Sequence, residues 1–231
     1  MREREVAMGS PPDKGFGQGD RALARWAVTT FEPEDEVLAE IRIRSLREGL
    51  PAIAVGPMDG LHLEVLARAV GAKRAVEIGT LGGYSGVCLA RGVGPDGLLH
   101  TFELEPRHAE VARQAFARAG VDGWVHLHVG PAEDMLAQVE KDGPFDLVFI
   151  DADKGGYPSY LAWAEEHLRV GGIVLADNAF AFGQIHRAGA AARDPEVKSL
   201  RLFAERLASG GRFRSTLIPT GEGLALGVKV R

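Results

Sequence analysis

The fold is decided by the stretch from residue 76 to residue 86, which reads VEIGTLGGYSG. Its first residues continue an apolar run typical of a strand, and the residues from Tyr84 onward begin a helical pattern. Glycines at such a junction let the backbone approach a ligand closely, and the first turn of the helix presents unpaired N–H groups. The stretch therefore predicts a ligand-binding turn, although a plain tight strand-to-helix turn would use the same residues.

Outward from this turn, short apolar runs alternate with amphipathic segments. The predicted strands are Ala75–Ile78, Leu98–Phe102, Val125–Val129, Leu147–Ile150 and Ile173–Ala176. Helices fit between them, opening at Pro106 and at Pro131 and covering about 157–169 before Gly171 and Gly172. Strands that alternate with helices of this length predict right-handed βαβ units, and hence a parallel sheet with helices on both faces.

The end of the chain follows a different pattern. A helix is predicted from Asp194 through Leu207, and strands follow near 213–218 and 224–230. The link between these strands reads only PTGEG, so the strands form a hairpin and one of them runs antiparallel. The predicted fold is therefore α/β, with a seven-stranded, mostly parallel sheet that ends in an antiparallel C-terminal hairpin.

The chain begins with a stretch that mixes charges with Gly and Pro, which predicts a flexible arm. Helices follow: one is predicted to open at Pro33, and another to run over Met58–Val70. The predicted division is an arm at 1–20 and a single domain at 21–231, with N-terminal helices at 21–71 and a core at 72–231.

Composition excludes several classes of protein. The chain has 231 residues and a formal net charge of −5, which argues against a general nucleic-acid binder because a phosphate-binding face brings a basic excess. The only cysteine, Cys88, cannot pair within the chain, which favours a reducing compartment. The N-terminus lacks the apolar segment of a signal peptide, and no apolar run approaches the ~18–20 residues of a membrane span. We therefore expect a cytoplasmic protein with no membrane partner.

Two acids near the glycine turn indicate the cofactor. A nucleotide-dependent oxidoreductase would carry G-x-G-x-x-G, but Leu81 takes the place of the second glycine if Gly79 is the first. Glu77 is a poor neighbour for a pyrophosphate, whereas S-adenosylmethionine has no phosphates and ends in an ammonium and a carboxylate. Glu103, at the end of the second strand, lies where a carboxylate can accept hydrogen bonds from both ribose hydroxyls. The pattern favours S-adenosylmethionine.

Oxygen-bearing side chains follow the fourth and fifth predicted strands. In a parallel sheet both strand ends emerge at the same edge, beside the cofactor crevice. Asp151, Asp177 and Asn178 offer two carboxylates and an amide oxygen, which suit Mg²⁺ first and also Mn²⁺ or Ca²⁺. A single acid at such a position would more often be a helix cap, but two strand ends with an adjacent Asn favour a divalent cation.

Three motifs taken together resemble those of the cation-dependent O-methyltransferases, the family that includes catechol and caffeoyl-coenzyme A O-methyltransferases. They are VEIGT..GYS from Val76, FDLVFIDADK.GY from Phe145 and ADN from Ala176, and the resemblance covers about residues 35–231. It implies a Rossmann-like methyltransferase fold and methyl transfer from S-adenosylmethionine to a hydroxyl of a catechol-like vicinal phenol.

The resemblance also implies roles by position. The implied cation ligands are Asp151, Asp177 and Asn178. Lys154 would be the base that accepts the phenolic proton, Glu103 would bind the ribose, and Ser85 would bind the methionine end of the cofactor. The other implied cofactor contacts are Val55, Asp59, Glu77, Gly79, Thr80, Ala132, Asp151 and Asp153.

The chain departs from the family pattern in several places, which include Leu81 and Gly82, where the family varies, and an N-terminal arm without a counterpart. Gly86 is an unusually small residue just inside a helix, and Val55 replaces a hydroxyl residue found in many members. The habit of the family implies a homodimer with the N-terminal arm near the partner's active site.

Two alternatives are an oxidoreductase with an adenosine cofactor and a non-catalytic module that binds S-adenosylmethionine. The missing G-x-G-x-x-G disfavours the first, and the complete set of cation ligands with Lys154 disfavours the second.

Overall fold

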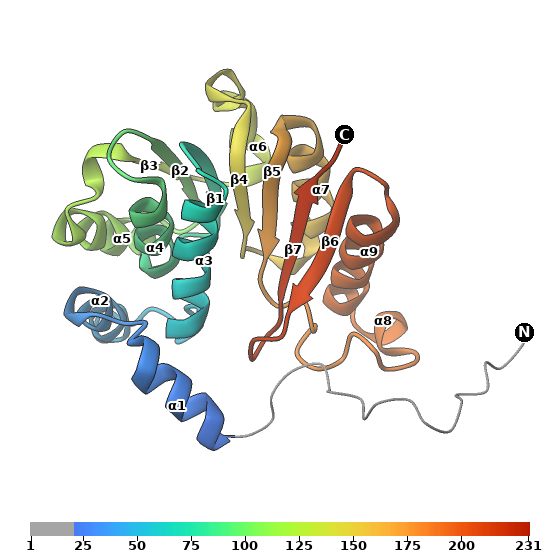
Figure 1. Cartoon of the computed structure of the whole chain (residues 1–231), viewed down its shortest axis with the longest axis horizontal. Coiled ribbons are helices and arrows are strands. Elements are labelled where there is room, and N and C mark those ends of the chain that lie inside the picture. Colours follow the sequence, from blue (N-terminus) through green and yellow to red (C-terminus); the bar gives the residue numbers. More distant parts are fainter. Residues whose placement is uncertain (1–20) are drawn as a thin grey trace, which may run out of the picture.

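The computed structural model describes residues 21–231, so the arm predicted at 1–20 lies outside the described residues. Seven strands form one sheet in the order β3-β2-β1-β4-β5-β7-β6 (Figure 1). The strands are β1 Arg74–Ile78, β2 Leu98–Glu103, β3 Val125–Val129, β4 Phe145–Ile150, β5 Leu168–Ala176, β6 Phe213–Ile218 and β7 Leu224–Lys229. The first five strands pair in parallel, while β7 runs antiparallel to both β5 and β6. The predicted fold class is confirmed.

Helices cover both faces of this sheet. They are α1 Arg21–Phe31, α2 Glu36–Arg47, α3 Pro57–Ala69, α4 Tyr84–Val93, α5 Pro106–Ala119, α6 Ala132–Met135, α7 Tyr157–His167, α8 Ala190–Arg193 and α9 Pro195–Ser209. Buried side chains of α2 to α5 pack on one face, and those of α7 to α9 pack on the other. No helix in the described part of the chain is long and apolar enough to cross a membrane.

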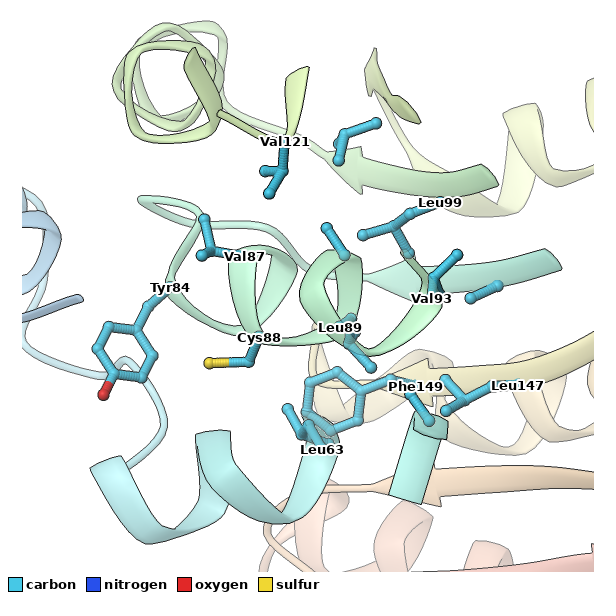
Figure 2. Close-up of a cluster of buried hydrophobic side chains, with 14 of the residues drawn as sticks. Leu63, Tyr84, Val87, Cys88, Leu89, Val93, Leu99, Val121, Leu147 and Phe149 are labelled. Carbon is cyan, nitrogen blue, oxygen red and sulfur yellow. The ribbon is translucent and has the colours of Figure 1, made fainter. Parts of the chain in front are cut away.

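Two cores result because successive side chains of a strand point to opposite faces. On β4, Phe149 belongs to the core beneath α3 and α4, whereas Val148 and Ile150 belong to the core beneath α7 and α9. Figure 2 shows the first core, in which Leu63 of α3 and Leu89 of α4 lie beside Phe149. A sheet that is apolar on both faces explains why its central strands read as continuous apolar runs.

The strand order reverses next to β1, which has β2 on one side and β4 on the other. Ligands of open α/β sheets bind at such a reversal, outside the carboxyl ends of the strands. The glycine turn after β1 and the acids after β2, β4 and β5 all lie at this edge. The fold therefore brings the predicted cofactor and cation residues to one side of the sheet.

The first predicted helix begins later than expected. Pro33 lies before the helix, and Asp35 is the N-cap, with its carboxylate accepting a hydrogen bond of 2.9 Å from the backbone N–H of Leu38. Glu36 is the acid in the first turn. A capping carboxylate satisfies an otherwise unpaired N–H group, which explains why Asp35 rather than Pro33 begins this helix.

Two further boundaries differ from the prediction. The helix expected at about 157–169 ends at His167, and β5 begins immediately at Leu168 and includes Gly171 and Gly172. The pairing of β4 with β5 shifts register at this point, so the glycines belong to an irregular strand rather than to a helix end. The helix opened by Pro131 is only four residues long and continues as short 3₁₀ turns.

Candidate active site

The glycine turn lies in contact with the end of β4. Gly79 has a φ of +101°, and a Cβ on this residue would overlap the backbone carbonyl oxygen of Asp151. Its own N–H donates a 3.0 Å hydrogen bond to the carbonyl of Phe102. Glycine is therefore required here because the protein's own backbone passes so closely.

Leu81 adopts a left-handed conformation, with a φ of +49°, two residues after Gly79. Its N–H donates a 2.7 Å hydrogen bond to Oε2 of Glu103. Oε1 of Glu103 accepts a 3.0 Å bond from the N–H of Glu105 and lies 3.3 Å from Nδ1 of His108. Glu103 is only 7% exposed, so this carboxylate fixes the glycine turn to the end of β2.

Glu77 is fully buried below the turn. Oε2 accepts a 2.6 Å hydrogen bond from the hydroxyl of Thr101, which is itself 2.5 Å from the hydroxyl of Thr80. Burial raises the pKa of Glu77 to about 8, while the hydroxyls of Ser85 and Thr101 act in the opposite direction. Oε1 has no hydrogen-bond partner among the described residues. The turn thus contains a buried carboxyl group with one unused oxygen.

The same carboxyl explains the small residue inside α4. A Cβ on Gly86 would lie 2.8 Å from Oε2 of Glu77 and 2.8 Å from the ring of Phe116. Contacts this short force a neighbour to move, and both neighbours are held in the core. Gly86 is therefore part of the packing around Glu77.

The ends of β4 and β5 bring together the two predicted acids and the lysine. Oδ1 of Asp151 accepts a 3.0 Å hydrogen bond from Nζ of Lys154. Burial raises the pKa of Asp151, and Lys154 opposes this rise. Burial together with repulsion from Asp151 raises the pKa of Asp177 to about 7. The buried Asp177 and the partly buried Asp151 thus lie near a single lysine, which is an environment suited to an additional positive charge.

Asn178 follows directly and adopts a left-handed backbone with a φ of +55°. It is buried together with Asp177. Asn tolerates this conformation better than most residues other than glycine, so the turn after β5 favours Asn at this position. The structure places all three predicted cation ligands at adjacent strand ends.

The chain is similar in sequence to known enzymes. The profile of a family described as O-methyltransferase matches residues 28–230. The chain belongs to the O-methyltransferase family. It is 46% identical to a catechol O-methyltransferase of Mycobacterium tuberculosis over 157 residues, which is 68% of this chain and 71% of the relative. It is 36% identical to a catechol O-methyltransferase of Niastella koreensis over 80% of this chain and 84% of the relative.

Solved structures agree with this assignment. An O-methyltransferase from Bacillus cereus, in complex with S-adenosylhomocysteine, has 35% sequence identity and a TM-score of 0.83 over 90% of this chain and 97% of its own. An O-methyltransferase from Streptomyces achromogenes that is involved in tomaymycin synthesis, in complex with S-adenosylmethionine, has 35% identity and a TM-score of 0.84 over 91% and 96%. Membership of this family excludes the oxidoreductase alternative.

Three other predicted residues of this O-methyltransferase come from separate segments: Val55 precedes α3, Ala132 begins α6 and Asp153 follows β4. Asp153 accepts a 2.8 Å hydrogen bond from the N–H of Gly156 and a 2.7 Å bond from the hydroxyl of Tyr160, so both of its oxygens have partners within the chain. Val55 is buried in the core beneath α3, while Ala132 packs against the core of the opposite face.

Asp59 lies closer to the proposed cation ligands. Burial raises its pKa, with the hydroxyl of Thr220 acting in the opposite direction, and its charge contributes to the raised pKa of Asp177. Asp59 therefore adds negative charge next to the end of β5.

Sequence reasoning missed two hydroxyl residues of the O-methyltransferase site. Thr101 is the partner of Glu77 because the two residues pair across β1 and β2, in a register that the sequence alone does not give. The hydroxyl of Tyr157 accepts a 3.0 Å hydrogen bond from Nζ of Lys154. Tyr157 is part of the motif FDLVFIDADK.GY, but the resemblance implied no role for it. Burial and the nearby carboxylates raise its pKa far above the ordinary value, so its hydroxyl stays protonated.

Proposed function

We propose that the protein transfers a methyl group from S-adenosylmethionine to a hydroxyl of a catechol-like vicinal phenol, with a divalent cation chelating the acceptor oxygens. The observation that carries this proposal is the group formed by the buried Asp177 with Asp151 and Lys154, next to the glycine turn. Two named relatives are catechol O-methyltransferases, which supports a vicinal phenol as the acceptor.

The cofactor is proposed to lie across the glycine turn, supplying an electrophilic methyl carbon on its sulfonium. Oε1 of the buried Glu77 has no hydrogen-bond partner among the described residues, an arrangement that suits the ammonium of the methionine end. Glu103 holds two backbone N–H groups, and a carboxylate has about four lone-pair sites, so it can still accept bonds from ribose hydroxyls. The proposed cofactor contacts are Val55, Glu77, Gly79, Thr80, Ser85, Glu103, Ala132, Asp151 and Asp153.

A divalent cation fits the donors at the ends of β4 and β5. Hard oxygen ligands from Asp151, Asp177 and Asn178 suit Mg²⁺ best, with Mn²⁺ and Ca²⁺ as further candidates. Among the described residues, no group of three or more His, Cys, Asp or Glu side chains could hold a metal ion. The proposed ligand set is not a group of that kind, since it consists of two acids and the amide of Asn178. When bound, the cation would lower the pKa of a chelated phenol and fix its oxygen.

Lys154 is the proposed base. Its amine lies 3.0 Å from Oδ1 of Asp151, so it stands beside the proposed acceptor position. In its neutral form the amine can take the phenolic proton. Asp151 therefore has two proposed partners, the cation and the amine that receives the proton.

We extend the proposal to the assembly and the compartment. A homodimer would cover α1, which exposes Trp26 and Phe31 to solvent. A cytoplasmic location is supported by the single free cysteine, Cys88, which is buried. The proposed partners are a small phenolic substrate and a second copy of the chain, and neither a nucleic acid nor a membrane.

A turnover assay tests this function. Catechol and a phenol with a single hydroxyl would be supplied with S-adenosylmethionine, with Mg²⁺ present or with an excess of chelator. We expect methylation of catechol only, loss of turnover in chelator, and recovery with Mg²⁺ or Mn²⁺. Calorimetric binding of S-adenosylhomocysteine should survive the chelator. Full turnover in chelator would mean that Asp151 and Asp177 are not cation ligands and act only as helix caps after the strands.

A further inference from the structure

The amine of Lys154 has two partners in the protein. Nζ donates one 3.0 Å hydrogen bond to Oδ1 of Asp151 and another to the hydroxyl oxygen of Tyr157, also at 3.0 Å. Beyond its bond to Cε, the nitrogen of a lysine has three positions, each filled by a proton or by the lone pair. Two of these positions point at oxygens that accept hydrogen bonds, so both must hold protons. Only the third position remains for chemistry.

The hydroxyl of Tyr157 is itself fixed to the ends of two strands. Its oxygen lies 3.3 Å from the carbonyl oxygen of Ile150 and 3.3 Å from that of Asp177. A phenol has one proton, so it donates to one of these carbonyls at a time and accepts from Lys154. Ile150 ends β4, and Asp177 follows β5. The hydroxyl thus connects the amine to the backbone that carries Asp151 and Asp177.

The tyrosine ring is a rigid support for this hydroxyl. Tyr157 is fully buried, and its ring packs edge-on against Phe203 with the centroids 5.5 Å apart. A lysine side chain, in contrast, is a flexible four-carbon stem that needs external contacts to hold one geometry. The side chain of Lys154 keeps 13% of its surface exposed, so the bond to the fully buried Tyr157 ties a partly exposed amine to the interior.

We propose that Tyr157 is the positioning residue of Lys154, and that its hydroxyl turns the unused position of the amine toward the acceptor hydroxyl. This inference rests on the proposed role of Lys154 as the base. A neutral amine keeps its two protons for Asp151 and Tyr157 and directs its lone pair outward. The phenolic proton then moves to Nζ, and the electron pair of the O–H bond stays on the oxygen that attacks the methyl carbon.

The substitution Tyr157→Phe removes the hydroxyl and keeps the ring that packs on Phe203. Because small displacements of a reacting group cost up to about 10²-fold, we expect kcat for catechol to fall roughly 10- to 100-fold. The KM values for catechol and for S-adenosylmethionine should stay within about twofold of wild type. A nitro-substituted catechol that is already ionised at the assay pH needs no base, so the variant should methylate it at the wild-type rate.

Tyr160→Phe is the matched control. Tyr160 is on the same helix and is also buried, but its hydroxyl bonds to Asp153 and not to Lys154. We expect this variant to keep kcat within about twofold for both acceptors. An equal loss of kcat for catechol and nitrocatechol in Tyr157→Phe, or no loss for either, would overturn the proposal.

A second measurement does not depend on turnover. Lys154 in the wild-type protein should react slowly with an amine-directed acylating reagent, because its amine is held by two hydrogen bonds. Mass spectrometry should find Lys154 labelled several-fold faster in Tyr157→Phe, and at the wild-type rate in Tyr160→Phe. If wild type fails to methylate vicinal phenols, the proposed function is wrong, and the labelling rate alone decides the positioning role. Unchanged labelling in Tyr157→Phe would refute it.

Discussion

The carboxyl group of Glu77 titrates differently in the folded and unfolded chain. Burial raises its pKa from 4.5 to about 8, so between these values the folded chain keeps a proton that the unfolded chain has lost. The free energy of unfolding therefore falls as pH rises from about 4.5 to about 8, and the contribution is level above that window.

We expect Glu77→Gln to remove this slope. Relative to wild type, the variant should gain stability between pH 5 and pH 8, by an amount on the order of a few kcal/mol at the upper end. Urea unfolding at several pH values measures the difference. Parallel pH profiles for the two proteins would show that Glu77 ionises normally in the folded state.

Glu103 offers a second test at the scale of one residue. Its carboxylate holds the N–H groups of Leu81 and Glu105 and is proposed to bind the ribose. Because hydrogen bonds to a charged group contribute about 1.5–3 kcal/mol, Glu103→Ala should weaken S-adenosylhomocysteine by roughly that amount. Calorimetry measures the affinity, and Glu105→Ala, at an exposed acid nearby, is the control. An unchanged dissociation constant would remove Glu103 from the site.

Residue roles could be predicted only in part from the sequence. The acids at strand ends were predictable because the carboxyl ends of parallel strands meet at one edge. The hydroxyl partners of Glu77 and Lys154 were not predictable, because they depend on strand register and on helix rotation. Thr101 meets Glu77 across the sheet, and Tyr157 reaches Lys154 from α7. The sequence predicts that Gly79 approaches the cofactor, which stays a prediction, whereas the observed close approach is that of Gly79 to the backbone of Asp151.

At the scale of elements, the ends of β4 and β5 place two carboxyl groups close together in a buried position. Repulsion from Asp151 adds to burial in raising the pKa of Asp177 to about 7. Such an arrangement destabilises the protein without a cation, because like charges are held near each other away from water.

We therefore expect Asp177→Asn to have opposite effects on stability and activity. The cation-free variant should melt a few degrees higher than wild type at pH 8, as about 1 kcal/mol corresponds to roughly 2–4 °C in a chain of this size. Methylation of catechol should nearly vanish, and added Mg²⁺ should rescue it poorly. Melting curves and turnover on the same samples measure both effects, and a variant with wild-type turnover would exclude Asp177 as a ligand.

Element positions were predicted well where periodicity is strong and poorly where irregular backbone intervenes. The strand expected at Leu98–Phe102 is observed at Leu98–Glu103, and Val125–Val129 is identical in both. The end of α7 was misplaced because Gly171 and Gly172 were taken to terminate a helix, whereas they belong to the irregular start of β5. Glycine ends helices and interrupts strands alike, so the sequence does not distinguish the two.

Helix α1 carries large apolar side chains that the rest of the described chain leaves exposed. Its residues Trp26, Val28 and Phe31 are 58%, 45% and 60% exposed. The predicted single domain at 21–231 and the arm at 1–20 remain predictions. If a second copy covers α1, the protein should be a dimer at micromolar concentration.

Replacing both Trp26 and Phe31 by Ala should shift this equilibrium toward the monomer, because these are the most exposed of the large apolar side chains of α1. Light scattering of wild type and variant measures the change. Leu202→Ala, which removes an exposed leucine from α9, is the control and should stay dimeric. A wild-type monomer with full activity would refute the dimer.

Gly79 and Asp151 share a wall of the site, since no atom fits between the glycine turn and the carbonyl at the end of β4. The methyl donor, proposed to contact Gly79, and the cation, proposed to bind Asp151, would therefore both affect the position of this backbone. If the methyl donor changes the affinity for the cation by some factor, thermodynamic reciprocity requires that the cation changes the affinity for the methyl donor by the same factor. In the proposed enzyme the binding of the two ligands would therefore be coupled, and the change in affinity that either ligand causes would be the same for both.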